Sequence, residues 1–351
     1  MRNGRWLVWL KAIGGALVAV LLVKTLFVTS CFIPSSGMEN SLYQGEGVLV
    51  GKWSYGLRLP FPSLLGYHRL GASPVERGDI VLFNNPNPAD PETGIEWREV
   101  FISRCVGLPG DTLSLNRALT VTGNQALSPD SKALYVYPSS SEDLMQAVLE
   151  TLGLLPGNTL VSYTSDGGYV RSFSHYEFYL VSQKLEGRIP VVPLDSRISQ
   201  ETHPFVVPRK QVPVKVYPWN AVLLCNTIVR HEHKQAGVQG DTLYVEGRPV
   251  GEYTFSKDYY WMASNDPVNL SDSRLFGFVP EDHLIGRACG YGIRQERDVS
   301  CSGCNSCGIK LKEEIVMKKE VILGSAYLDR WSIIPNSFAY DTVRVELVTI
   351  I

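Results

Sequence analysis

Hydroxyl and thiol groups that could do chemistry occur in two parts of this chain. Ser35 and Ser36 stand directly before Gly37 in the segment 33–42, which reads Ile-Pro-Ser-Ser-Gly-Met-Glu-Asn-Ser-Leu. A serine hydroxyl is a poor nucleophile at neutral pH, so it attacks a carbonyl only when a base removes its proton. A lysine amine is such a base only when burial depresses its pKa from about 10.4 and keeps it neutral. Serine chemistry at this segment therefore depends on a base supplied from elsewhere in the chain.

The second candidate group is a set of cysteines near the C-terminus. The chain has seven cysteines, and four of them have a spacing that could hold zinc or an iron–sulfur cluster: Cys289, Cys301, Cys304 and Cys307. In an oxidising compartment, thiols pair as disulfides instead, and an odd total leaves at least one unpaired. We predict no cofactor, with a metal at these four cysteines as the alternative. Cys105 and Cys225 lie in apolar runs and are predicted to be small core residues.

Composition sets the broad class of the protein. The chain has 351 residues, enough for one large domain or two smaller ones. Its net charge of -2 gives no indication of nucleic-acid binding. Many Gly, Pro, Tyr and Val residues, with few long helical patterns, favour a mainly β fold.

The N-terminal segment 6–30 is predicted to form one transmembrane helix. At a rise of ~1.5 Å per residue it is about 35 Å long, which exceeds a ~30 Å hydrocarbon core. Lys11 and Lys24 interrupt it, and each can reach an interface by snorkelling. Because Arg2, Arg5 and Lys11 lie on the N-terminal side, we expect the N-terminus in the cytoplasm and the main domain outside the inner membrane.

Two other interpretations of this segment compete with an anchor. A cleaved secretory peptide would need an Ala-x-Ala-like site after the apolar run, and none follows. Residues 28–31, Val-Thr-Ser-Cys, loosely resemble a lipoprotein cleavage box, but Lys24 lies too close before them. The uncleaved anchor is the preferred interpretation.

The elements that must position the serines are mostly strands. Short apolar runs bounded by turn residues predict strands at 47–50, 78–83 and 100–106, and helical spacing predicts a helix within 139–155. The interval 113–240 is long and loosely patterned, which suggests a subdomain inserted into a β core. We therefore divide the chain into an N-terminus and anchor (1–30), a β core (31–112 and 241–290), an inserted subdomain (113–240) and a Cys-containing C-terminal module (291–351). In the C-terminal module, strands are predicted at 320–323 and 342–348.

Four segments, in order, resemble the bacterial signal peptidase I family, the membrane serine proteases (family S26, leader peptidases) that remove signal peptides from exported proteins. The segments are 33–42, the aromatic-Tyr-Gly stretch 51–58, the pair 77–83 and 102–111 ending in Gly-Leu-Pro-Gly-Asp, and 259–288 with Asp-Ser-Arg at 272–274. The resemblance implies a signal-peptidase-like β core. It also implies hydrolase activity through a Ser-Lys dyad.

Both dyad positions are substituted in this chain. By the resemblance, the nucleophile position is Gly37 and the lysine position is Ser103, which is followed by the expected Arg104. The serine that orients the family's lysine corresponds to Leu270, whereas Asp272 and Arg274, which look structural in the family, remain. A serine hydroxyl cannot replace an amine as base. The resemblance therefore predicts a retained scaffold without its catalytic groups.

The resemblance also assigns a peptide-binding surface. Ser35 matches the family's oxyanion-hole serine, and Cys31, Ile33 and Ile102 fall where the family has pocket-lining residues, although ordinary core packing explains these three equally well. One hypothesis is a pseudoprotease that binds signal peptides or other extended segments of exported proteins. The other is an active serine endopeptidase using Ser36, which would face the opposite side of an extended segment and has no identified base.

Overall fold

The computed structural model describes residues 3–33, 35–59, 66–116, 118–122, 128–154, 160–194, 201–268 and 271–294. All of these residues belong to one of the two compact units into which the chain divides. This part of the chain is mainly β, and its paired strands run antiparallel. The mainly β class predicted from composition is therefore confirmed.

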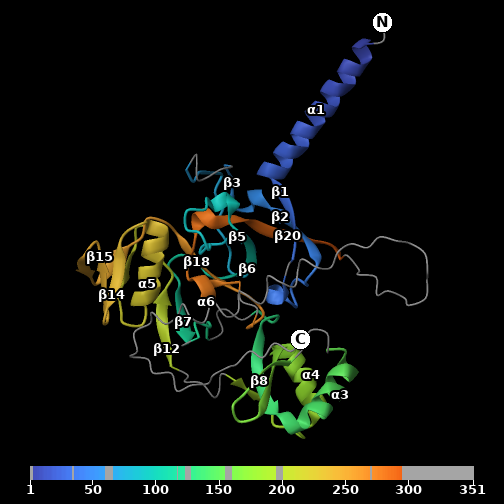
Figure 1. Cartoon of the computed structure of the whole chain (residues 1–351), viewed down its shortest axis with the longest axis vertical. Helices are drawn as coiled ribbons and strands as arrows, with labels where there is room; N and C mark the ends of the chain where they lie inside the picture. The colour runs from blue at the N-terminus through green and yellow to red at the C-terminus, as the bar shows by residue number, and fades with distance from the viewer. Residues whose placement is uncertain are drawn as a thin grey trace, which may run out of the picture. The chain divides into compact units, whose positions relative to one another are not determined.

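The main sheet has seven strands and carries the segment around Gly37 at one edge (Figure 1). Its strands, in spatial order, are β1 (Val28–Phe32), β2 (Glu46–Gly51), β20 (Leu284–Arg294), β5 (Ile80–Asn84), β6 (Val100–Gly107), β18 (Tyr259–Ala263) and β19 (Val279–Pro280). Strands distant in sequence are thus neighbours. Because β20 pairs with both β2 and β5, it joins the N-terminal strands β1 and β2 to the rest of the sheet.

Both faces of this sheet are covered by apolar side chains. Along β5, Val81 and Phe83 belong to one buried cluster with Cys105 and Met262, while Leu82 belongs to another. This alternation follows from the two-residue period of a strand. The second cluster contains Ile33, Met38, Leu42, Val48 and Val50, and it supports the segment around Gly37.

A buried carboxylate joins three of the segments that resemble signal peptidase I. Asp79 is 6% exposed and accepts a hydrogen bond from the Tyr55 hydroxyl at 3.0 Å. Its other oxygen lies 3.1 Å from Nε of Arg287. Burial, followed by the charge of Asp79, raises the pKa of Tyr55, so its hydroxyl remains a donor. These contacts fix β20 and the turn before β5 relative to each other.

Within residues 132–154 and 160–193, four strands form a separate sheet with two helices beside it (Figure 1). The helices pack on the sheet through buried residues such as Met145, Leu149 and Phe173, and an ion pair joins Arg171 to Glu142. The elements are β11 (Val192–Pro193), β8 (Lys132–Pro138), β10 (Gly168–Ser174), β9 (Leu160–Tyr163), α3 (Glu142–Leu152) and α4 (His175–Leu185).

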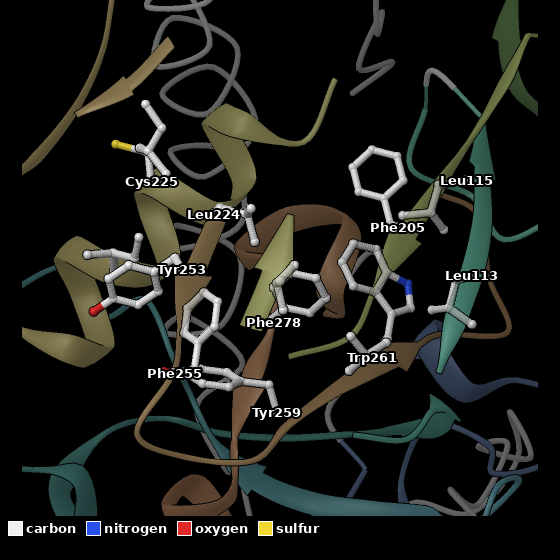
Figure 2. Packing of buried hydrophobic residues seen from close by; sticks show 14 of the residues in the cluster. Leu113, Leu115, Phe205, Leu224, Cys225, Tyr253, Phe255, Tyr259, Trp261 and Phe278 are labelled. Carbon is white, nitrogen blue, oxygen red and sulfur yellow. The ribbon is translucent and has the colours of Figure 1, made fainter. Parts of the chain in front are cut away.

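A third cluster is built mainly from aromatic and aliphatic side chains around Trp261. Figure 2 shows Trp261 beside Leu113 and Phe205, and its ring lies 5.3 Å from that of Phe278. Smaller elements surround it: β7 (Thr112–Asn116) with β12 (Thr202–Val206), β13 (Pro213–Lys215) with β17 (Glu252–Thr254), β14 (Ala236–Gln239) with β15 (Thr242–Val245) and β16 (Arg248–Val250), and the helix α5 (Ala221–Thr227). The short helix α6 (Ser273–Phe276) instead contributes Phe276 to the cluster of Val81 and Phe83. The pair β3 (Leu57–Arg58) and β4 (Arg69–Leu70) lies outside the cluster around Trp261.

The N-terminal helix α1 (Asn3–Leu26) is shorter at its C-terminal end than the sequence predicts. Residues 28–30, expected in the helix, begin β1 and pair with residues 49–51 of β2. Ladder hydrogen bonds to a strand 20 residues away thus override the local helical pattern. Within the described residues, no helix reaches the combination of length and hydropathy that a membrane crossing requires.

The other predicted elements agree with the structure where it describes them. The three predicted strands are β2, β5 and β6, and the predicted helix is α3. Cys105 and Cys225 are buried, as predicted for core residues. The strands expected at 320–323 and 342–348 lie outside the described residues, and the division of the chain into domains stays a prediction.

Candidate functional site

The segment around Gly37 leaves the edge strand β1 and turns sharply. After Ile33 the chain forms the 3₁₀ turn η1 (Ser36–Met38), preceded by Ser35 in an extended conformation. Met38 and Leu42 are 1% and 0% exposed, so their side chains anchor the turn in the cluster beneath it. The backbone at Gly37 is therefore fixed by packing on both sides.

The loop after β18 clamps this turn through hydrogen bonds. The backbone N–H of Asp266 donates to the Gly37 carbonyl at 3.0 Å, and Ser36 Oγ donates to Asp266 Oδ2 at 3.2 Å. Asn265 Nδ2 donates to the Glu39 carbonyl at 3.0 Å and to Ser41 Oγ at 2.8 Å. Residues more than 220 positions away in sequence thus determine the conformation of the segment 36–41.

Asp272 and Arg274 hold that loop in turn. The Asp272 side chain is fully buried, and its Oδ2 accepts from the Ser264 backbone N–H at 2.7 Å and from Arg274. Arg274 Nη2 also donates to the Asp266 carbonyl at 3.3 Å. Asp272 additionally caps α6 by accepting from the Arg274 backbone N–H. Both side chains therefore position the loop that contacts Gly37.

Ser103 lies on β6 and is completely buried. Its Oγ lies 2.8 Å from the carbonyl oxygen of Ile102 and 2.8 Å from that of Ser271. Both partners are acceptors, so the hydroxyl proton is directed to the backbone. In this arrangement Ser103 acts as a hydrogen-bond donor and offers no basic group to a neighbouring serine.

Two other ionisable groups, the amine of Lys132 and the thiol of Cys31, lie near the turn. Lys132 Nζ lies 2.7 Å from Glu39 Oε2, and its side chain is 1% exposed. The thiol of Cys31 is unpaired, but burial raises its pKa and keeps it protonated, which argues against a cysteine nucleophile.

A cavity of about 170 Å³ lies beside the turn. It is lined by all five residues that the sequence assigned to the oxyanion hole, the nucleophile position and the pockets: Cys31, Ile33, Ser35, Gly37 and Ile102. Met38 and Ser271 complete this part of the wall. The volume suits a small side chain rather than a drug-sized ligand. Ser36 and Ser103 are not among the lining residues, although their neighbours are.

Comparison with known proteins identifies the family. The profile of the family described as "Signal peptidase, peptidase S26" matches residues 6–156. A signal peptidase I from Buchnera aphidicola is 24% identical over 279 residues, covering 77% of this chain and 71% of the relative. A probable signal peptidase I-2 from Synechocystis is 27% identical, and the match covers 52% of this chain and 71% of the relative. A signal peptidase I from Pseudomonas aeruginosa is 35% identical over 103 residues, which are 29% of this chain and 32% of the relative. These matches support this chain as a member of the signal peptidase I family.

Within this signal peptidase I family protein, several predicted site residues lie outside the described part. Leu270, predicted to replace the serine that orients a catalytic lysine, is one of them, as are Cys301, Cys304 and Cys307. Cys289 is described and is an exposed free thiol. The assignment of Gly37 and Ser103 to the family's nucleophile and base stays a prediction.

Sequence reasoning missed the two residues that clamp the Gly37 turn. No local sequence pattern connects Asn265 and Asp266 to residues 36–41. These two residues follow β18, and the long-range pairing of β18 with β6 is what brings them into the main sheet. The position of Val100 in the cavity wall was predictable, because Val100 lies two residues before Ile102 and residues two apart on a strand point to the same face.

Proposed function

We propose that this signal peptidase I family protein takes part in signal-peptide processing as a pseudoprotease that binds extended peptides without cutting them. The observation that carries the proposal is the environment of Ser103, whose hydroxyl donates to backbone carbonyls in a fully buried position. The position that resembles the family's lysine therefore supplies no base. At Gly37 no side-chain hydroxyl exists to be activated.

The binding half of the proposal is supported by the cavity beside Gly37. Ser35 and Gly37 both line it, and a serine hydroxyl with a backbone N–H is the donor set of an oxyanion hole. Such donors bind a peptide carbonyl even when no nucleophile is present. The apolar wall from Ile33 and Ile102 would accept a small side chain of the same peptide. Signal peptides of exported proteins are the substrates that the family resemblance favours.

A second candidate function is an active endopeptidase that uses Ser36. The hydrogen bond from Ser36 to Asp266 is the observation in its favour, because it gives this hydroxyl an anionic partner. A carboxylate is a much weaker base than a neutral amine. Ser36 is also absent from the cavity lining, which places its hydroxyl poorly for a peptide bound there. We therefore favour the pseudoprotease.

Peptide binding is tested by photocrosslinking a signal peptide to the purified full-length protein. We expect saturable crosslinking above that of a scrambled peptide, and we expect Ile102→Trp to weaken it by at least about tenfold, or ~1.4 kcal/mol, because the indole fills the cavity. Val212→Trp, at a side chain 43% exposed and outside the cavity, is the matched control and should bind normally. Equal crosslinking of the signal peptide and its scrambled version would refute peptide recognition.

We further propose that the segment 1–30 anchors the protein in the inner membrane with its N-terminus in the cytoplasm. Apolar side chains of α1 are widely exposed, among them Trp9, Ile13 and Val20 at 64–68%. A helix that is apolar all round is stable only when another phase or partner covers it. The flanking Arg2 and Arg5 support the orientation by the positive-inside rule.

Membrane attachment is tested by extracting cell membranes with alkaline carbonate. We expect the full-length protein to stay in the membrane pellet, and external protease to degrade it in spheroplasts, since the main domain lies outside. Replacing Leu17 and Val20 by lysine should release it, because charged side chains at a helix centre oppose insertion. Release of the unaltered protein by carbonate would contradict an integral anchor.

A further inference from the structure

A second cavity, of about 280 Å³, lies away from the site around Gly37. Its walls come from the segment 91–98, the turn η7 (Ile228–Glu232) with His233 after it, the 3₁₀ turn η8 (Glu281–His283) and Lys257. Its charged and imidazole side chains are mostly basic: Arg98, Arg230, His231, His233, Lys257 and His283. None of these residues takes part in the proposed peptide site, so their gathering needs a separate explanation.

His231 is the side chain that points most clearly to a missing partner. It is 4% exposed, yet within the described residues no hydrogen bond engages its ring nitrogens, and it lines the cavity. Its ring instead lies 5.5 Å from the ring of His283 and 6.1 Å from that of Tyr259. Buried polar side chains are almost always hydrogen-bonded, so an unpaired imidazole facing a cavity indicates a ligand there. The π-helical geometry of η7 is itself frequent at functional sites.

The acidic groups at this cavity are largely neutralised. Asp282 Oδ1 lies 2.7 Å from Nδ1 of His283, and Oδ2 lies 2.8 Å from Nζ of Lys257. Burial alone would raise the pKa of Asp282, but the hydrogen bond from His283 and the charge of Lys257 outweigh it and lower the pKa. Asp282 therefore stays ionised with both oxygens engaged. The other carboxylate, Glu92, is exposed to solvent.

The hydrogen bonds of His283 fix the orientation of Arg98. Because Nδ1 of His283 donates to Asp282, its Nε2 is the acceptor for Arg98 Nη1 at 3.0 Å. Arg98 Nε also donates to the Thr93 carbonyl at 2.9 Å. A guanidinium has five N–H donors, so these two bonds leave others available at the cavity wall. The lining of the cavity thus includes three cations, Arg98, Arg230 and Lys257, and two carboxylates, Glu92 and Asp282.

We propose that this cavity binds a phosphate-type oxyanion, held by the Arg98 guanidinium and by the ring of His231. Arginine and imidazole N–H groups form strong, charge-assisted hydrogen bonds with such anions. Within the described residues no cluster of His, Cys, Asp and Glu has a metal-binding arrangement, which favours an anion over a cation. The volume accommodates a phosphate group, either as the free ion or as the headgroup of an anionic lipid.

Binding of the anion is expected to involve protonation of His231. Burial, followed by the charge of His283, lowers the pKa of His231, so the ring is neutral when the cavity is empty. The groups that face it are His283, Asp282, Lys257, Arg230 and Tyr259. A bound anion would offset the cationic members of this set and favour the imidazolium. Lower pH should therefore strengthen binding of an anion whose own charge does not change.

The test is calorimetric titration of the full-length protein, in phosphatidylcholine nanodiscs, with inorganic phosphate and separately with sulfate. We expect saturable phosphate binding with a Kd on the order of 100 μM, equivalent to about -5.5 kcal/mol. Sulfate keeps its charge between pH 5.5 and 7.5, and it should bind at least about threefold more tightly at the lower pH because His231 gains a proton. The titration is repeated in nanodiscs that contain phosphatidylglycerol. If a lipid headgroup occupies the cavity, these nanodiscs suppress phosphate binding. If the free ion occupies the cavity, phosphate binding is unchanged.

Three variants complete the test. Arg98→Gln should weaken phosphate binding at least about tenfold by removing a charged, multidentate donor, and His231→Gln should abolish the pH dependence of sulfate binding. Arg188→Gln, at an exposed arginine paired with Glu186, removes the same charge elsewhere and should bind phosphate normally. No saturable phosphate or sulfate binding by the unaltered protein, or equal weakening by Arg98→Gln and Arg188→Gln, would overturn the proposal.

Discussion

Replacing Asp272 by asparagine is expected to lower the free energy of unfolding by about 3–5 kcal/mol, because it breaks a buried ion pair and leaves one charge unpaired. The Asp272 side chain is fully buried, and that of its partner Arg274 is 12% exposed. Asparagine keeps the shape but removes the negative charge and one of two acceptor oxygens. Asp272 Oδ2 also receives the Ser264 backbone N–H, and Arg274 also holds the Asp266 carbonyl. The loop that clamps Gly37 should therefore loosen with the loss of stability.

This prediction is checked by urea unfolding of the purified protein followed by far-ultraviolet circular dichroism. The matched control is Glu186→Gln, which removes a carboxylate whose side chain is 70% exposed and paired with Arg188 at the surface. Surface pairs contribute at most about 1 kcal/mol, so this change should be small. If both substitutions had the same effect on the unfolding midpoint, the structural role assigned to Asp272 would be wrong.

Local patterns were sufficient to predict the strands of the main sheet. In β5 and β6, apolar runs follow turn residues and contain β-branched side chains, and both segments are strands in the structure. The helix α3 was predictable because Leu144, Ala147, Val148 and Leu152 repeat at helical spacing. Of the repeat in α3, Val148 is buried and Leu144 and Leu152 pack against the same cluster, whereas Ala147 is exposed.

A helix that the sequence analysis missed, α4, carried a recognisable signal. Ser174 and Glu177 form a capping box, in which each side chain accepts from the other residue's backbone N–H. The pattern Ser-x-x-Glu before a helix is readable in sequence. The helix was overlooked because its exposed Tyr176 and Tyr179 suggest strand composition rather than helical periodicity.

The composition of the site was more predictable than its hydrogen bonding. Resemblance alone named Cys31, Ile33, Ser35, Gly37 and Ile102, and the structure gathers these five residues around one cavity. The bond from Ser36 to Asp266 joins residues 230 positions apart and was not predictable, since no sequence period relates them. The same holds for the contacts of Asn265. Such contacts depend on how the loop after β18 folds back, which only the assembled sheet determines.

The largest expected effect concerns catalysis itself. Removing members of a catalytic nucleophile–base set typically lowers turnover by on the order of 10⁶. Here Gly37, the predicted nucleophile position, has no side chain, and the hydroxyl oxygen of Ser103 lies 2.8 Å from the carbonyl oxygens of Ile102 and Ser271, which are both acceptors. The Lys132 amine is engaged in an ion pair with Glu39. We therefore expect no cleavage of a preprotein by the purified full-length protein.

The measurement that tests this account most directly is a preprotein cleavage assay followed by mass spectrometry. It compares the unaltered protein, Ser36→Ala and, as a positive control, a signal peptidase I that processes the same preprotein. We predict an intact preprotein with both forms of this chain and complete processing by the control enzyme. Cleavage at the signal-peptide junction by the unaltered protein, abolished by Ser36→Ala, would show that Ser36 is an active nucleophile and would contradict the pseudoprotease proposal.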